Sequence, residues 1–244
     1  ASACTLGLMG EAMAQPRKSQ QQPPWGPQAQ IVLDVTQPLS FPRQGRLPLF
    51  AQPASDPGLL SAAAARQLVS QLDARGVAAI CSWSPDQREQ CLARALPVAR
   101  AQQELGLSVN VNATSCMYSF FDVDPATAHV DAEGQPFFDE SLWRKEMGCP
   151  FTLDPRRPVI RERVDYYARA YADAGLGVGF CWADWEIDGP LEINRAHEYA
   201  CRCVRCRQNI PGIEDFVTFQ RAIRQMRSFL QFDTYAQPLL ARFP

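Results

Sequence analysis

The chain has 244 residues, of which 46% are hydrophobic, and its 24 basic and 26 acidic side chains give a net charge of -2. This length and composition allow a sizeable buried core and favour one large globular domain. The balanced charges exclude electrostatic attraction to nucleic acid or to an anionic membrane as the basis of function. No apolar run reaches the roughly 20 residues that cross a bilayer, so no membrane span is expected.

The first thirty residues differ in composition from the rest of the chain. Residues 1–14 end in Ala12-Met13-Ala14, a small-x-small pattern after an apolar stretch, and are interpreted as the remnant of a signal peptide. This pattern predicts export to the periplasm or the extracellular space, and an Ala-rich terminus without signal function is the alternative. Residues 15–30 are rich in Gln and Pro, which is typical of a linker. The folded domain is therefore expected at 31–244.

From Ile31 onward, short apolar runs alternate with amphipathic stretches, as in a parallel sheet covered by helices. We expect strands in at least one of the runs IVLDV (31–35) and RLPLFAQ (46–52), then at 77–83, 108–115 and 177–188, and helices at 57–75, 86–106 and 160–175. Four such units predict the N-terminal half of a (β/α)8 TIM barrel. A doubly wound sheet is the alternative, but no Gly-rich turn follows any strand. The connection of roughly 40 residues at 117–158 is expected to be a lid or cleft wall.

Acidic and aromatic residues follow the fourth expected strand. Alternation along a strand would place Trp182, Asp184 and Glu186 on one face, at the carboxyl edge where barrel active sites lie. Paired carboxyl groups cleave glycosidic bonds, and indole rings stack on sugars. We expect Glu186 to be the acid/base and Asp184 to orient the substrate. The predicted substrate contacts are Trp83, Asn112, Trp182 and Trp185. Capping of the next helix or pairing with an arginine is the alternative role of the acids.

Three cysteines within six residues, Cys201, Cys203 and Cys206, have the spacing of a tetrahedral zinc site. A fourth ligand is needed, and the candidates are Cys116, Cys149, Cys181 and His197. Cys116 is favoured because its loop would neighbour that of the fourth strand. Four protein ligands leave no open position for water, which predicts a structural zinc. Disulfide bonds are the alternative that export would permit.

An acid-bearing fourth strand followed by Cys-x-Cys-x2-Cys resembles the family forty-two glycoside hydrolases of clan A, retaining β-galactosidases with a TIM barrel. The resemblance covers Cys116 to Cys206. It implies zinc held by Cys116 and the cysteine triplet, the acid/base at Glu186, and a nucleophile on a later strand beyond Pro244. The family has Asn before the acid/base, where this chain has Trp185, so β-galactosidase specificity is not implied.

Together these patterns predict an exported glycoside hydrolase-like protein with a carbohydrate substrate and a two-carboxylate mechanism. A non-catalytic carbohydrate-binding or scaffold protein on a degenerate barrel is the alternative. A metalloenzyme with an open zinc position is a third hypothesis. The sequence indicates no particular oligomeric state.

Overall fold

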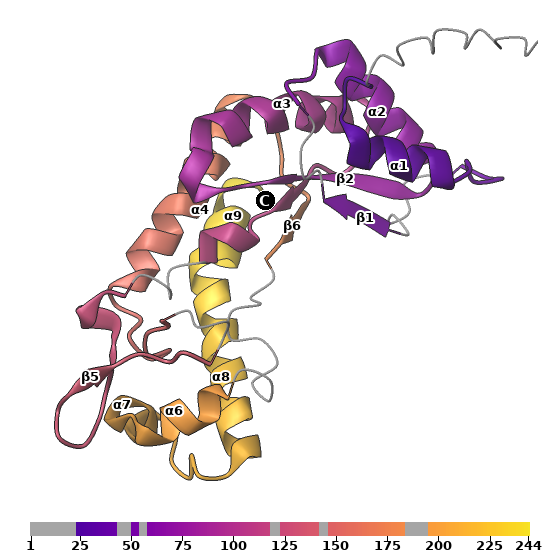
Figure 1. Cartoon of the computed structure of the whole chain (residues 1–244). Helices are drawn as coiled ribbons and strands as arrows, with labels where there is room; N and C mark the ends of the chain where they lie inside the picture. Colours follow the sequence, from indigo (N-terminus) through magenta and orange to yellow (C-terminus); the bar gives the residue numbers. More distant parts are fainter. Residues whose placement is uncertain (1–22, 43–49, 54–57, 118–122, 142–145, 184–194) are drawn as a thin grey trace, which may run out of the picture.

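The computed structural model describes residues 23–42, 50–53, 58–117, 123–141, 146–183 and 195–244 (Figure 1). Two regions are distinguished in it. The sheet region contains the parallel strands and the helices between them. The hairpin lobe, residues 123–141, 146–155 and 195–213, lies at the other end of the molecule, and the long helices α4 (Arg156–Asp173) and α8 (Phe216–Gln231) run between the two (Figure 1).

The parallel sheet has the strand order β1-β2-β3-β6. Its strands are β1 Phe50–Pro53, β2 Val77–Ser82, β3 Asn110–Asn112 and β6 Phe180–Trp182. The register pairs Cys81 of β2 with Val111 of β3, and Asn112 of β3 with Trp182 of β6. All six residues of β2 are apolar or small, and five are buried, as expected for a central parallel strand covered on both faces.

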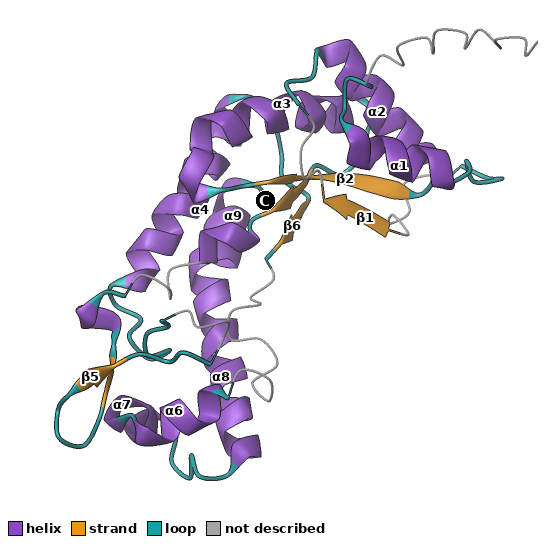
Figure 2. Ribbon diagram, viewed as in Figure 1, coloured by secondary structure: helices purple, strands orange, loops and turns teal. Residues whose placement is uncertain are grey.

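One helix precedes the sheet and others connect its strands (Figure 2). They are α1 Pro27–Val35, α2 Ala62–Ala74, α3 Arg88–Glu104 and α4 Arg156–Asp173, with the short 3-10 turn η1 Pro85–Gln87 before α3. The Ser61 hydroxyl accepts a hydrogen bond from the N–H of Ala64 and so caps the start of α2. Pro97 lies inside α3 without ending it. The helices expected between the strands are therefore confirmed.

The end of the chain is helical. It consists of α6 Ala196–Arg202, α7 Val204–Asn209, α8 Phe216–Gln231, the π-helical turn η4 Phe232–Ala236 and α9 Gln237–Arg242. The buried residues of α8 recur at helical spacing: Phe219, Ile223, Met226 and Leu230. Beyond α8, the hydroxyl of Tyr235 donates to the carbonyl of Ala113 next to β3, at 2.8 Å. This chain of contacts joins the sheet region to the hairpin lobe.

The connection between β3 and α4 supplies most of the hairpin lobe. Its elements are the 3-10 turns η2 Thr114–Met117 and η3 Pro125–Thr127 and the antiparallel strands β4 His129–Val130 and β5 Pro136–Phe137. Further along, Asp139 and Met147 form an isolated antiparallel bridge. The predicted lid or cleft wall is thus a small folded unit that packs with α7.

The sheet region has an aromatic centre. Trp83, which follows β2, is fully buried and stacks on Tyr167 of α4 with ring centroids 5.2 Å apart and planes 5° from parallel. Tyr171, one turn later, meets the same indole edge-on at 5.4 Å. The hydroxyl of Tyr167 donates to the carbonyl of Ser84 at 2.6 Å, so its polar end is paired inside the core.

The predicted TIM barrel is wrong. In the described part of the chain β1 pairs only with β2 and β6 pairs only with β3, so the four-stranded sheet stays open at both edges. A barrel needs about eight tilted strands that return to the first one. Here the strands have three to six residues, and the described residues before α4 and those at 195–213 belong to the hairpin lobe.

The first apolar run was also misread as a possible strand. Residues 31–35 form the second half of α1, which begins at Pro27 with a proline in its first turn. A short run of four apolar residues with one aspartate does not separate a strand from a helix by periodicity. Because Trp25 is also buried, the described fold begins inside the predicted linker, whereas residues 1–22, with the predicted signal remnant, lie outside the described residues.

Among the helices that the structure describes, none combines the length and the apolar character needed to cross a bilayer.

Candidate metal centre

Four buried side chains of the hairpin lobe converge on one point. They are His129 at the start of β4, Cys149 in the loop before α4, Cys203 between α6 and α7, and Cys206 in α7. Their ligand atoms all lie within 4.8 Å of one another, and each residue is at most 2% exposed. Three thiols and an imidazole from three separate segments of the chain thus meet in one buried position.

The separations fit a single tetrahedral ion. The sulfur of Cys149 is 3.7 Å from that of Cys206 and 3.8 Å from that of Cys203. The Nδ1 atom of His129 is 3.9 Å from the Cys206 sulfur. A tetrahedral metal with bonds of about 2.3 Å to sulfur places two sulfur ligands about 3.8 Å apart, whereas a disulfide joins sulfurs at about 2.05 Å. All three cysteines are free thiols, so the disulfide alternative does not apply to them.

Local structure explains how Cys203 and Cys206 reach the same point. Cys203 has an extended backbone (φ −83, ψ 124) that ends α6 and begins α7. The two sulfurs then lie one helical turn apart along α7. Arg205, between them, donates to the carbonyl of Ala128 at 2.6 Å, which joins α7 to the residue before His129.

The other two residues of the cluster are held by the loop and the hairpin. The N–H of Cys149 donates to the carbonyl of Thr127 at 2.8 Å. A side chain at Gly148 would put its Cβ 2.6 Å from that same carbonyl, so only glycine fits before Cys149. The ring of His129 stacks on Phe137 across the hairpin at 5.1 Å. Arg202 is on α6, and its guanidinium lies 4.6 Å from the centre of the Phe137 ring.

The thiols change one another's ionisation. Hydrogen bonding with the thiols of Cys149 and Cys206 lowers the pKa of Cys203. The hydrogen bond with Cys203 raises the pKa of Cys149 to about 12, and the bonds with both neighbours, together with burial, raise the pKa of Cys206 far above its ordinary value. These hydrogen bonds therefore favour a thiolate at Cys203 over one at Cys149 or Cys206. A coordinated metal would stabilise each thiolate that binds it, so all three cysteines could be ionised together.

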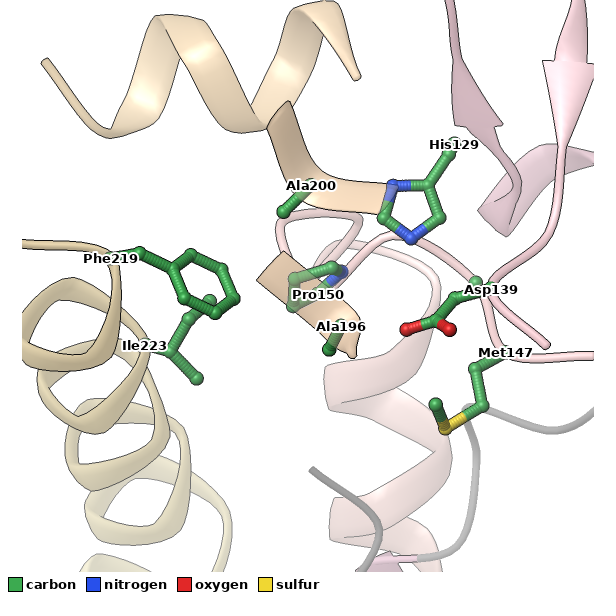
Figure 3. A pocket seen from close by; sticks show the side chains of 9 residues that line it. His129, Asp139, Met147, Pro150, Ala196, Ala200, Phe219 and Ile223 are labelled. Carbon is green, nitrogen blue, oxygen red and sulfur yellow. The ribbon is translucent and has the colours of Figure 1, made fainter. Parts of the chain in front are cut away.

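A small cavity of about 20 Å³ lies beside the imidazole (Figure 3). It is lined by His129, Asp139, Met147, Gly148, Pro150, Ala196, Ala200, Phe219 and Ile223. His129 and Asp139 are the polar side chains of this lining. Asp139 is 4% exposed, and burial raises the pKa of its carboxyl group.

The structure brings together only part of the ligand set expected from the sequence. Cys203 and Cys206 are in the cluster, but Cys116 is not: it is buried next to Trp83, with its sulfur 3.7 Å from the Trp83 carbonyl. Burial raises the pKa of Cys116 to about 12, as for an ordinary core thiol. Cys201 is also outside the cluster, and its sulfur lies 3.3 Å from Nε2 of His197.

Two of the clustered residues were missed or not favoured. Cys149 was one of the open candidates for the fourth ligand, and His129 was not considered. Both lie in the connection between β3 and α4, so their approach to α7 depends on tertiary packing. Composition could have pointed to His129 as a fourth ligand. The chain has only two histidines, and His129 lies in the same connection as Cys149.

The three described residues among the predicted substrate contacts lie at the ends of neighbouring strands but differ in exposure. Trp83 is a core residue and does not reach the surface. Asn112 is half-buried, and its side-chain oxygen accepts from the N–H of Thr114 at 3.0 Å. Trp182, at the end of β6, is 47% exposed. Asp184, Trp185 and Glu186 lie outside the described residues.

No protein-family model, curated protein or solved structure matches this chain. The geometry defines a buried cluster of three thiols and one imidazole that could hold a metal ion.

Proposed function

We propose that this chain is a zinc-binding protein in which one structural Zn²⁺ holds the hairpin lobe together. The observation that carries the proposal is the convergence of Cys149, Cys203, Cys206 and Nδ1 of His129 within 4.8 Å, all buried. Such a span leaves room for one ion. Its spacing matches the tetrahedral Cys3His arrangement of structural zinc sites.

The donor set favours zinc over other metals. Thiolates are soft ligands, which disfavour Mg²⁺ and Ca²⁺, and imidazole with thiolates in a tetrahedron suits Zn²⁺. Four protein ligands occupy every position of that tetrahedron. The metal would therefore cross-link the chain and would not activate a water molecule, which argues against the metalloenzyme hypothesis.

The role of the metal follows from what it joins. His129 belongs to the hairpin, Cys149 to the loop before α4, and Cys203 and Cys206 to the junction of α6 and α7. These elements are each only two to seven residues long. Elements this short are marginal without tertiary support, so a bond network at their centre would supply most of the lobe's stability.

The test is the zinc content of purified full-length variants. We expect one zinc per chain in the wild type and less than one tenth of that in Cys149→Ser. Cys201→Ser is the matched control because it removes a thiol from the same triplet but outside the cluster, and it should keep the metal. Loss of zinc in Cys201→Ser with retention in Cys149→Ser would contradict this ligand set.

Glycoside binding or cleavage by an exported protein is kept as a second candidate. It is favoured by the exposed indole of Trp182 at the carboxyl end of β6, in register with Asn112. The predicted acid/base Glu186 follows Trp182 closely in the chain. If the protein cleaves glycosides, Glu186→Gln should abolish turnover while zinc content and melting temperature are unchanged. An active Glu186→Gln variant would contradict this role.

A further inference from the structure

A second buried ionisable side chain lies beside the metal centre without being a ligand. Asp139 is 4% exposed, and it shares its cavity with His129 and otherwise apolar residues. Nδ1 of His129 faces the Cys206 sulfur at 3.9 Å. Figure 3 shows that the other ring nitrogen, Nε2, points toward the carboxylate of Asp139. The imidazole thus lies between the sulfur cluster and a buried acid.

We infer that Asp139 is a positioning residue of the metal centre. Its carboxylate accepts a hydrogen bond from the Nε2–H of His129, directly or through one water molecule in the cavity, and so holds the ring as an Nδ1 ligand. The inference rests on the proposed zinc site. Metal-bound histidines usually donate their second ring nitrogen to a carboxylate, a carbonyl or water, and the arrangement around His129 offers a carboxylate.

The chemistry of imidazole makes this contact consequential. A neutral ring carries one proton, and when Nε2 holds it, the lone pair of Nδ1 is available to the metal. A carboxylate at Nε2 therefore selects the tautomer that can coordinate at Nδ1. It also increases the electron density of the ring and its strength as a ligand. The apolar lining of the cavity strengthens such a bond because little water competes for it.

The backbone holds Asp139 in place relative to two ligands. Asp139 and Met147 exchange two hydrogen bonds, of 2.9 and 2.8 Å, and Met147 is two residues before Cys149. On its other side, Asp139 is two residues after Phe137, whose ring stacks on His129. The carboxylate is therefore fixed by the same pairing that sets the positions of His129 and Cys149.

A purely local role for Asp139 is the competing explanation. Its Oδ1 accepts a hydrogen bond from the N–H of Ser141 at 2.8 Å, which stabilises the turn after β5. Asp139→Asn separates the two roles, because an asparagine oxygen can still accept from Ser141. The NH₂ group of the new asparagine would then face the Nε2–H of His129, so two donors would meet. The negative charge of Asp139 is also lost. Glu140→Gln is the matched control, since Glu140 is exposed and loses the same charge.

The first measurement is zinc affinity of the full chain by competition with a chromophoric chelator. We expect binding to Asp139→Asn to be about 10- to 100-fold weaker than to the wild type, and Glu140→Gln to be unchanged. Wild-type affinity in Asp139→Asn would overturn the inference and leave the zinc proposal intact. A wild type that binds no zinc would overturn the zinc proposal, and the inference with it.

The second measurement reads the ring itself, independently of whether Asp139→Asn folds well. In zinc-loaded wild type labelled with ¹⁵N at histidine, we expect His129 to be bound through Nδ1, with an Nε2 proton that is shifted downfield and exchanges slowly. In Asp139→Asn this proton should move upfield and exchange faster, which a turn-stabilising role would not cause. A rapidly exchanging Nε2 proton in the wild type, or coordination through Nε2, would overturn the inference.

Discussion

The sheet region and the hairpin lobe are stabilised in different ways. In the sheet region, helices of 13 to 18 residues pack over parallel strands, and the centre is aromatic and aliphatic, with Trp83, Tyr167 and Tyr171 fully buried. In the hairpin lobe, two strands of two residues and helices of seven and six residues surround a centre of thiols and an imidazole. A two-stranded hairpin and a two-turn helix are each marginal in water.

The difference shows two ways in which one chain can stabilise a folded region. Long elements bury enough apolar surface to offset the conformational entropy that folding costs. Elements of a few residues cannot, and small units commonly rely on a metal or disulfides instead. The cysteines of the lobe occupy the place that leucine or phenylalanine would have in a larger core. The two regions should therefore respond differently to metal and to core substitutions.

Removal of zinc should have the largest effect, and it should be confined to the hairpin lobe. Structural zinc contributes about 10 to 16 kcal/mol to the folding of small metal-binding domains at neutral pH. On chelation, we expect amide exchange at 125–141 and 196–210 to approach the rate of the unfolded chain, while α2 and β2 stay protected. Hydrogen-exchange mass spectrometry measures both in one sample. Added zinc should restore protection, and equal loss in both regions would contradict the division.

Trp83→Ala should have the opposite pattern. Trp83 is fully buried between Tyr167 and Tyr171, and truncation of such a side chain costs about 3 to 5 kcal/mol. We expect urea unfolding of the zinc-loaded protein to show this loss, with one zinc per chain retained. Trp182→Ala is the matched control, because Trp182 is 47% exposed and its removal should change stability by less than about 0.5 kcal/mol. A larger loss in Trp182→Ala than in Trp83→Ala would contradict the assignment of the core.

The sequence predicts the sheet region better than the hairpin lobe for a physical reason. β2, α2 and α3 carry their signal locally, in apolar runs and helical periodicity. β2 and α3 lie where they were expected, whereas α2 begins at Ala62, behind the Ser61 cap, and not at residue 57. Closure of the sheet is not a local property. Four units of alternating strand and helix were extended to a barrel, but they form an open sheet.

The candidate metal centre was predictable in kind, but not in the full set of residues that form it. Cys203 and Cys206 share one helical turn, so their spacing alone indicates a common ligand role. Cys201 has equally suggestive spacing, but it precedes the bend at Cys203 and its sulfur instead lies beside His197. His129 and Cys149 reach α7 through the packing of the connection after β3, and no sequence spacing encodes that approach.

The smallest expected effect concerns α8, the helix that extends from the hairpin lobe toward the sheet. Asp215 caps its first turn, accepting hydrogen bonds from the N–H and the hydroxyl of Thr218 at 2.8 and 2.7 Å. The Thr218 hydroxyl, with that N–H, lowers the pKa of Asp215 below its ordinary value of 3.8. The stabilisation by the charged carboxylate is therefore fully present above about pH 4 and is lost as the pH falls through the lowered pKa.

Asp215→Asn isolates this charge, because asparagine also caps helices but does not titrate. We expect the wild type to melt a few degrees higher than Asp215→Asn at pH 6, by less than about 4 °C, and the difference to vanish toward pH 3. Since acid also removes zinc from both proteins, the difference between them at each pH is the quantity to measure. A difference that stays constant from pH 6 to pH 3 would show that the carboxylate charge does not stabilise α8.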